Sequence, residues 1–288
     1  MAFKNILWAA MAGVLFGPAL AWSADEPVVT AASALLPLTP NFYPAENVWL
    51  VQAGVSQGNT SIKAVTELFG NAVSRINLSE HSTALASSVR YGLSSHSELM
   101  VSGTYLAAST LYQTSWSMPQ LAYTYRITPD NSPLKTNLSA MYTPRSLFPG
   151  PWSGPAKYTL AGVSNYEIAP NKWVAMGAQY RLKSSELFPG LLLLTSGVTQ
   201  AFSSVVVSAG VSAKKLDSAH PNVASRTNNA WTPGVNLAIG KAIDARRGIT
   251  LTVAHDRQKI NEVLDSGYGA VNTKVRSSSA ALAYYQAF

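Results

Sequence analysis

The sequence predicts an all-β fold, a transmembrane antiparallel up-and-down β-barrel of about twelve strands, and three observations support this prediction. Apolar and polar residues alternate along segments of about 9–11 residues, the length at which a tilted strand crosses a bilayer. Short and longer connections tend to alternate between these segments. Charged residues make up only 12% of the chain, about half of their usual share, while the hydrophobic share is an ordinary 47%. Such a composition suits a lipid-facing exterior around a polar interior.

The chain begins with a predicted signal peptide, residues 1–21. Lys4 supplies its positive charge, residues 6–16 form a short apolar run, and Ala19-Leu20-Ala21 provides the small residues of a cleavage site. Cleavage after Ala24 is an alternative. The apolar run is too short for a transmembrane anchor, and no run of 18 or more apolar residues follows it. Export is therefore expected, and because the chain has no cysteine, disulfide bonds cannot stabilise it.

Residues 47–288 form the predicted barrel. Twelve segments within it alternate with period 2, and an even number places both ends of the barrel on one side of the membrane. Tyr and Trp lie mostly on the apolar faces, as in the aromatic girdles of membrane barrels, which disfavours a soluble sandwich or propeller. The predicted strands are 47–57, 84–93, 98–108, 117–127, 134–143, 156–168, 172–183, 190–200, 203–215, 230–243, 248–259 and 279–288.

The connections predict which end of the barrel faces the periplasm. Short periplasmic turns and longer external loops are typical of bacterial outer-membrane barrels. We therefore expect a monomer in the outer membrane of a Gram-negative bacterium. The short connections are 94–97, 128–133, 169–171, 201–202 and 244–247, and the others are 58–83, 109–116, 144–155, 184–189, 216–229 and 260–273.

Two regions lack a clear strand pattern. Residues 22–46 contain four prolines and are expected to lie in the periplasm or to fold into the lumen. Residues 58–83 are expected to form a structured external loop or to extend the first two strands, and residues 64–76 could instead form a short helix.

The strand faces opposite to the apolar ones predict a net-positive lumen. A charge on the lipid face near the midplane would cost about 2–4 kcal/mol, so inward placement is expected. Eight bases against three acids leave an excess of five positive charges, which predicts a path for anionic or polar solutes. The candidate lumen residues are Arg90, Arg126, Lys135, Arg145, Lys157, Arg181, Lys183 and Lys214, with Glu98, Glu167 and Asp256. Arg257, Lys259, Lys274 and Arg276 fall on the outward face near the external strand ends.

Two alternatives remain open. In a filled barrel these bases pair with the acids and nothing passes, since twelve strands lie between barrels that side chains fill and open porins. Such a closed structural or adhesive barrel would bind partners through loops 58–83, 144–155 and 216–229.

The other alternative is an outer-membrane enzyme that acts on lipid. GVSQG (54–58) matches the G-x-S-x-G pattern, but Ser56 continues an alternating strand, whereas the motif needs a strand–turn–helix context. His81 and His255 lack a recognisable set of catalytic partners, and His96 is expected to be solvated in a turn. No metal-ligand spacing or phosphate loop is present. We expect no enzyme, no cofactor and no nucleic-acid partner.

Two stretches resemble known proteins. The C-terminal residues Leu282, Tyr284 and Phe288 resemble the C-terminal signature of outer-membrane barrels, although Gln286 departs from it. This resemblance implies recognition by the barrel-assembly machinery, with Tyr284 and Phe288 as the signal, beside outer-membrane lipid as a partner.

The segment VRYGLSSHSELMVSGTYL (89–106) is similar to the "RYGLTDRLEL" hairpin of a family of outer-membrane transporters assigned to the MetA pathway of phenol degradation. The stretches PQLAYTYRI and SPLKTNLSAMYTPR (119–127 and 132–145) are also similar, while Ser95, His96 and Ser97 replace a charged turn. The resemblance implies a channel or transporter for small aromatic solutes, and the basic lumen would suit a carboxylated one. No catalytic or binding residues carry over.

Overall fold

The computed structural model describes residues 44–110, 115–117, 119–145, 156–182, 190–217, 231–244, 246–263 and 269–288. The predicted signal peptide, residues 22–43 and Lys183 lie outside the described residues. The predictions made for them stay predictions.

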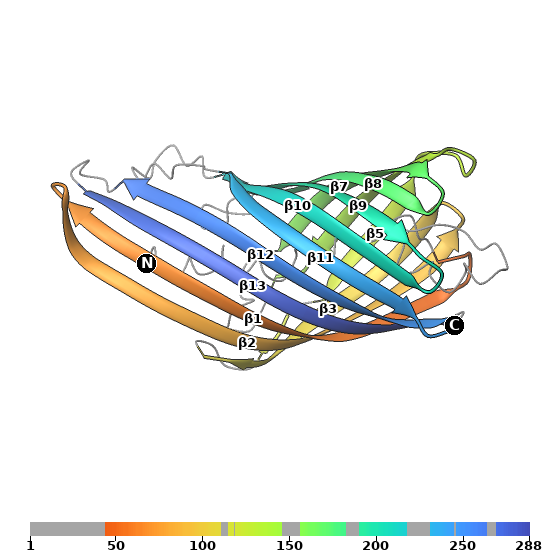
Figure 1. Ribbon diagram of the computed structural model, residues 1–288, viewed down its shortest axis with the longest axis horizontal. Helices are drawn as coiled ribbons and strands as arrows, with labels where there is room; N and C mark the ends of the chain where they lie inside the picture. Colours follow the sequence, from red (N-terminus) through yellow and green to blue (C-terminus); the bar gives the residue numbers. More distant parts are fainter. Residues whose placement is uncertain are drawn as a thin grey trace.

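Twelve antiparallel strands form one closed sheet, and a further strand of two residues, β4, pairs with Tyr105 and Leu106 of β3 (Figure 1). The strands are β1 (Trp49–Leu68), β2 (Asn71–Ser94), β3 (Ser97–Ser109), β4 (Ser115–Trp116), β5 (Gln120–Arg126), β6 (Leu134–Thr143), β7 (Lys157–Ala169), β8 (Lys172–Arg181), β9 (Gly190–Ala201), β10 (Val205–Asp217), β11 (Thr232–Ala242), β12 (Arg247–Val263) and β13 (Gly269–Ala287).

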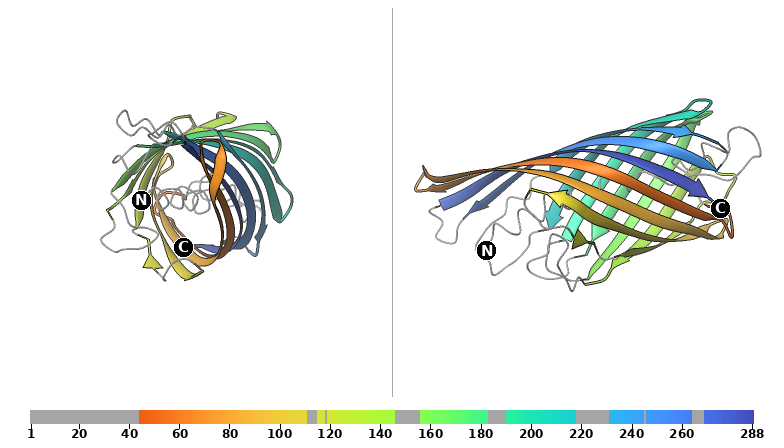
Figure 2. Two further views of the ribbon diagram at one scale, coloured as in Figure 1. Left: turned by 90° about the vertical axis from the view of Figure 1, so that its left-hand side faces the viewer. Right: turned by 90° about the horizontal axis from the view of Figure 1, so that it is seen from below.

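The barrel is closed by its first and last strands. Every long strand pairs with its sequence neighbours, and β1 pairs with β13 from Leu50–Ala287 to Leu68–Gly269. Figure 2 shows the resulting ring of strands in end view. The backbone N–H of Phe288 donates to the carbonyl of Trp49 at 2.9 Å, so the C-terminus belongs to the sheet. The predicted fold class is confirmed, and pairing of the ends explains why the tail is apolar: a closed barrel leaves no exposed sheet edge.

Four strands are longer than the sequence pattern indicates. Region 58–83 extends β1 and β2 around a two-residue turn, in which Phe69 and Gly70 have φ values of 50° and 78°. Positive φ at both central residues is the backbone of a tight hairpin turn. The helix alternative for residues 64–76 is wrong, because they pair across this hairpin, Ala64 with Ile76. β12 and β13 are also extended, and these four strands project beyond the others at one end of the barrel (Figure 1). The connection lengths predict that this end is external, and it is called the external end below.

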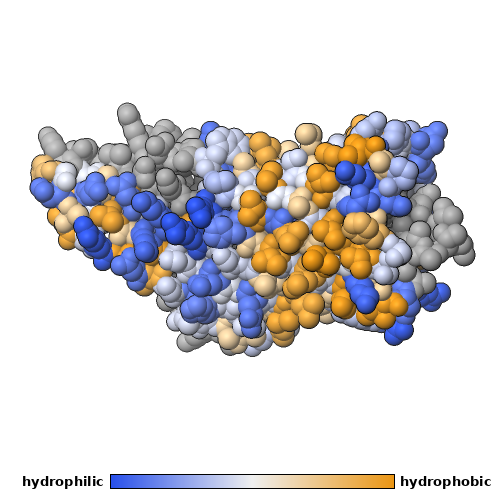
Figure 3. All heavy atoms as spheres, viewed as in Figure 1, coloured by the Kyte–Doolittle hydropathy of each residue, from blue (hydrophilic) through white to orange (hydrophobic). Residues whose placement is uncertain are grey.

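Side chains alternate as predicted between an apolar exterior and a largely polar interior. Figure 3 shows part of the exposed apolar band in orange. Facing inward, hydroxyl groups form hydrogen bonds between neighbouring strands, such as Thr124–Ser139 at 3.0 Å and Thr199–Ser208 at 2.8 Å. The band includes Val51, Leu85, Leu99, Leu121, Tyr123, Leu138, Leu160, Met176, Leu237, Leu251 and Leu282.

The first described residues lie against the interior side of β2. The side chain of Pro44 is fully buried, and Glu46 forms a parallel bridge with Gly92. The N–H of Asn47 donates to the Gly92 carbonyl at 2.9 Å, and Tyr91 Oη donates to Asn47 Oδ1 at 2.7 Å. A Cβ at Gly92 would lie 2.5 Å from the Pro44 carbonyl oxygen, so only glycine leaves room for this backbone. The end of the proline-containing segment therefore docks inside the opposite rim, which the short turns predict to face the periplasm and which is called the periplasmic end below.

Candidate functional site: the charged interior of the barrel

A buried ion pair lies at the periplasmic end of the interior. Arg90 on β2 and Glu98 on β3 are 8% and 5% exposed. The Arg90 Nη2 atom lies 2.7 Å from Glu98 Oε2, and Nε donates to the same oxygen at 2.9 Å. Two charge-assisted hydrogen bonds compensate for much of the desolvation that burial of both charges imposes.

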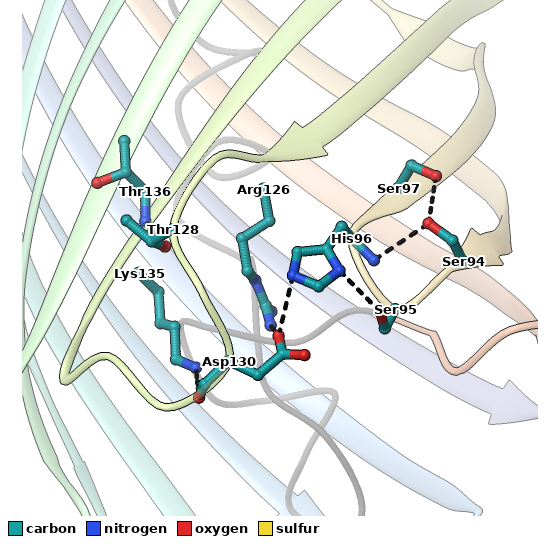
Figure 4. Close-up of polar contacts among 9 residues, drawn as sticks. All are labelled: Ser94, Ser95, His96, Ser97, Arg126, Thr128, Asp130, Lys135 and Thr136. Carbon is teal, nitrogen blue, oxygen red and sulfur yellow. Dashed lines mark hydrogen bonds and ion pairs between the residues drawn. The ribbon is translucent and has the colours of Figure 1, made fainter.

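A second group of polar side chains gathers around Asp130, in the turn between β5 and β6 (Figure 4). Arg126, which is 1% exposed, places Nη1 at 3.4 Å from Asp130 Oδ1. His96, in the turn between β2 and β3, places Nε2 at 3.3 Å from the same oxygen. The ammonium group of Lys135 donates to the backbone carbonyl of Asp130. Asp130 therefore brings two predicted lumen bases, Arg126 and Lys135, to one point.

The serine-rich turn of residues 94–97 supports this group. His96 Nδ1 lies 2.7 Å from Ser95 Oγ, and the carbonyl of His96 accepts a hydrogen bond from the Arg126 N–H at 2.7 Å. The hydroxyl groups of Ser94 and Ser97 lie 2.7 Å apart. Ser95, one of the residues that replace the charged turn of the resembling family, thus helps to fix the position of the His96 ring.

The sequence analysis did not include Asp130 among the interior acids, and it expected His96 to be solvated. Residues 128–133 were expected to form only a short turn. A signal was available, because this aspartate follows an inward arginine by four residues and precedes an inward lysine by five. In the short turn between Arg126 and Lys135, Asp130 folds back towards the interior and contacts both of these inward cations.

An ion pair towards the external end joins two strands that are not neighbours. Lys214 Nζ on β10 lies 2.6 Å from Asp256 Oδ2 on β12, with side chains 11% and 19% exposed. Gly234 of the intervening strand β11 stands directly opposite Asp256 and Ser212. A Cβ at Gly234 would overlap the Asp256 carboxylate and lie 2.5 Å from Ser212 Oγ. The glycine provides the space in which lysine and aspartate meet across β11.

The other candidate residues lie near the ends of the barrel. Lys157 and Arg181, at the external ends of β7 and β8, are half-buried and close enough for their charges to repel. Arg145 is exposed beyond β6. Glu167 is exposed near the turn between β7 and β8, where it accepts a hydrogen bond from the Asn171 N–H at 3.1 Å. The structure thus gathers the candidates into a periplasmic and an external group.

Three apolar clusters also face the interior, and the sequence analysis named none of them; one, in the extended parts of β1, β2 and β13, consists of Ile62 and Val275 with Leu78 packed against them. Met100 on β3 packs against a buried cluster of Ala122, Met141 and Ala161, on β5, β6 and β7. At the periplasmic end a larger cluster fills part of the interior. It consists of Leu50, Trp173, Ala201, Val206 and Tyr285. Because these apolar side chains point inward, the interior is not lined by polar residues alone, contrary to what the positions of the charged residues predicted.

The residues considered for catalysis do not form a hydrolytic site in the described part of the chain. Ser56 Oγ lies 3.4 Å from the Ala84 carbonyl oxygen and points inward, whereas His81 lies on the outer face. His255 Nδ1 lies 2.8 Å from Ser278 Oγ, but Arg257 Nε donates to His255 Nε2 at 3.3 Å. That donation assigns the proton of a neutral ring to Nδ1, which then donates to Ser278 and cannot act as its base.

Within the described ranges, no cluster of three or more His, Asp or Glu could hold a metal ion. The same ranges contain no helix that is both long and apolar enough to cross a membrane.

Comparison with solved structures identifies barrels of the same fold. The crystal structure of an outer membrane channel from Pseudomonas putida F1 matches with a TM-score of 0.57 and 10% identity, covering 85% of this chain and 97% of that chain. A mutant of TodX, a monoaromatic hydrocarbon channel, matches with a TM-score of 0.51 and 12% identity, covering 96% and 98%. At these identities the likeness shows the fold alone. No protein-family model and no curated protein matches the chain.

Proposed function

We propose that this protein is a passive outer-membrane channel for small solutes and that its interior favours anionic or polar cargo, including aromatic carboxylates. The observation that carries the proposal is a closed twelve-strand barrel with an apolar exterior and buried charges at both ends of its interior. A row of apolar side chains around a closed sheet suits lipid on the outside, and buried charges suit a polar path inside. The shared fold with outer-membrane channels supports the same function.

The charges of the described interior support a weak preference for anions. Six bases (Arg90, Arg126, Lys135, Lys157, Arg181 and Lys214) face four acids (Glu80, Glu98, Asp130 and Asp256), which leaves two positive charges. This excess is smaller than the five expected from the sequence, because Asp130 and Glu80 are added and Lys183, Arg145 and Glu167 are left out. A modest positive potential raises the local concentration of anions without trapping them.

The apolar cluster around Met141 suits an aromatic solute. Met100 and Met141 offer polarisable sulfur atoms, which make favourable contacts with aromatic rings. A ring on this cluster and a carboxylate near a basic end would together fit an aromatic acid. The proposal agrees with the cargo that the resemblance to the MetA-pathway family implies, and one of the structural neighbours is described as a monoaromatic hydrocarbon channel.

Single-channel recording in a planar bilayer under a KCl gradient tests the proposal. We expect discrete conductance steps and a reversal potential that indicates weak anion selectivity. Asp256→Asn removes a negative charge from the lumen and should increase anion selectivity, whereas Lys214→Met should reduce it. Lys241→Gln, on the outer face at the periplasmic end, serves as the control and should leave the reversal potential unchanged. A folded barrel that never conducts would refute the channel.

The rate at which solutes enter liposomes that contain the protein tests the proposed cargo independently of ion conduction. Above the background of protein-free liposomes, benzoate should enter faster than benzyltrimethylammonium, an aromatic cation that does not cross lipid unaided. Met141→Asp, which places a negative charge on the apolar cluster, should slow benzoate selectively. Equal rates for both solutes would contradict the carboxylate preference and leave the channel itself supported.

A closed structural barrel is the second candidate. The cluster around Trp173 and the ion pairs at the periplasmic end favour it, because they fill part of the interior. In the same recordings this candidate predicts silence from a correctly folded protein.

A further inference from the structure

The projecting parts of β1, β12 and β13 carry cations on their outer face. Lys63, Arg257, Lys274 and Arg276 are all exposed there, and we name these four residues the basic patch. The register places Arg276 directly opposite Arg257, and Lys274 directly opposite Lys63 on one side and Lys259 on the other. Figure 3 shows hydrophilic residues, in blue, over this part of the barrel beside the apolar band.

This arrangement of cations lowers the stability of the sheet when nothing is bound to it. Like charges directly opposite one another on neighbouring strands repel. Among the described side chains, no acidic residue forms an ion pair with any of the four. Glu67 lies on the same face of β1 but two outward positions beyond Lys63, and Asp256 faces inward and binds Lys214. A negative group from outside the chain would relieve the repulsion.

The height of the patch indicates where that group comes from. On β12 the outward residues Ile249, Leu251 and Val253 belong to the apolar band, and Arg257 follows Val253 by four residues. A rise of about 3.4 Å per residue and a tilt of about 40° place Arg257 about 10 Å above Val253 along the membrane normal. The headgroup layer adjoins the hydrocarbon and is about 5–7 Å thick on each side, so a residue about 10 Å above Val253 in the apolar band reaches that layer.

We propose that the basic patch binds phosphate groups of lipids in the outer leaflet. Guanidinium groups bind phosphate through paired hydrogen bonds, and ammonium groups act as point charges. Neighbouring strands lie about 4.8 Å apart, so cations that face each other across them can share one phosphate. Arg257 is held on this face by its hydrogen bond to His255 at 3.3 Å. The inference rests on the proposed outer-membrane location but not on conduction.

The test measures binding of diphosphoryl lipid A to the refolded full-length protein by native mass spectrometry in a neutral detergent. Each cation removed should weaken binding about fivefold, so Lys63→Gln/Lys274→Gln/Arg276→Gln should weaken it on the order of a hundredfold. A matched control, Lys172→Gln/Lys241→Gln/Arg246→Gln, removes the same charge at the periplasmic end and should retain the parent affinity. The dephosphorylated glycolipid should bind the parent and both variants equally weakly.

Two outcomes would overturn the proposal: the patch variant binds lipid A as the parent does, or the control variant loses as much affinity as the patch variant. Lys63→Arg/Lys274→Arg, which keeps the charge, should restore binding. If the triple variant does not fold, Lys63→Gln and Lys274→Gln, each alone, should show the fivefold loss, and parent affinity in both would reject the patch. Unchanged conductance in a variant that has lost lipid A binding would separate this result from the channel proposal.

Discussion

The ion pair between Lys214 and Asp256 depends on the missing side chain of Gly234, and Gly234→Ala tests this dependence. The new methyl group would overlap the Asp256 carboxylate, which is the end of a flexible side chain, so the carboxylate moves rather than the backbone. The new Cβ would lie 2.0 Å from Asp256 Oδ1, whereas ordinary contacts lie at 3.4–4 Å, so the carboxylate must retreat by about 1.4 Å. The Nζ–Oδ2 distance would then grow from 2.6 Å to about 4.0 Å.

The magnitude follows from Coulomb's law. With an effective dielectric constant of about 20, the attraction falls from about 6.4 to about 4.2 kcal/mol, a loss of about 2 kcal/mol. An off-rotamer Asp256 adds about 1 kcal/mol. We therefore expect Gly234→Ala to reduce the free energy of unfolding by about 3 kcal/mol.

Urea unfolding in lipid vesicles, followed by tryptophan fluorescence, measures this change. Gly103→Ala is the matched control, because a Cβ there meets no atom within 4 Å and should have little effect. In an Asp256→Asn background the steric conflict persists but the charge is gone, so Gly234→Ala should be about 2 kcal/mol less harmful. An equal effect in both backgrounds would show that the ion pair plays no part, and parent stability for Gly234→Ala would refute the role of the glycine.

Three further predictions follow from other sites. Gly92→Ala places a methyl group against the backbone of Pro44 and Ala45, so it should release residues 44–48 from β2, destabilise the barrel by about 1–3 kcal/mol and speed their cleavage by proteinase K, with Gly103→Ala again as control. The Arg247 guanidinium, which donates to the Asp244 carboxylate at 2.6 Å, lowers the pKa of that carboxyl below its ordinary 3.8. The stabilisation is therefore complete above pH 3.8 and is lost as the pH falls through the lowered value, so Asp244→Asn should be less stable than the parent at neutral pH and equal to it in strong acid. Phe288→Ala keeps the backbone bonds to Trp49 but removes the exposed terminal ring, so it should lower the amount of folded barrel in outer membranes while refolding in vitro stays normal; equal amounts in membranes would reject Phe288 as an assembly signal.

Much of the fold could be predicted because the alternation of side chains has a direct physical cause. Leu237 and Ile239 had to face lipid and Asn236 the interior, since a shift by one residue would exchange these faces. The same argument predicted that the last strand pairs with the first. A shift by two residues, however, preserves the faces, so no pattern within a single strand indicates which residues stand opposite one another.

The details of the interior depend on that register. Gly234 lies between Lys214 and Asp256 only through the pairing of three strands. The reach of Asp130 back into the barrel depends on turn geometry, which the alternation does not encode. For the same reason the strands of region 58–83 looked like a loop, because polar residues beyond the apolar band no longer show a lipid-facing stripe.

The unequal strand lengths determine where the barrel yields to force. The seam between the first and last strands runs through 19 residue pairs, from Leu50–Ala287 to Leu68–Gly269. The two seams on either side of β5, with β3 and with β6, run through only six pairs each. A pull applied across the wall would therefore separate the strands beside β5, while the first and last strands stay paired. The junction that assembly must make between distant parts of the sequence is among the last to be undone.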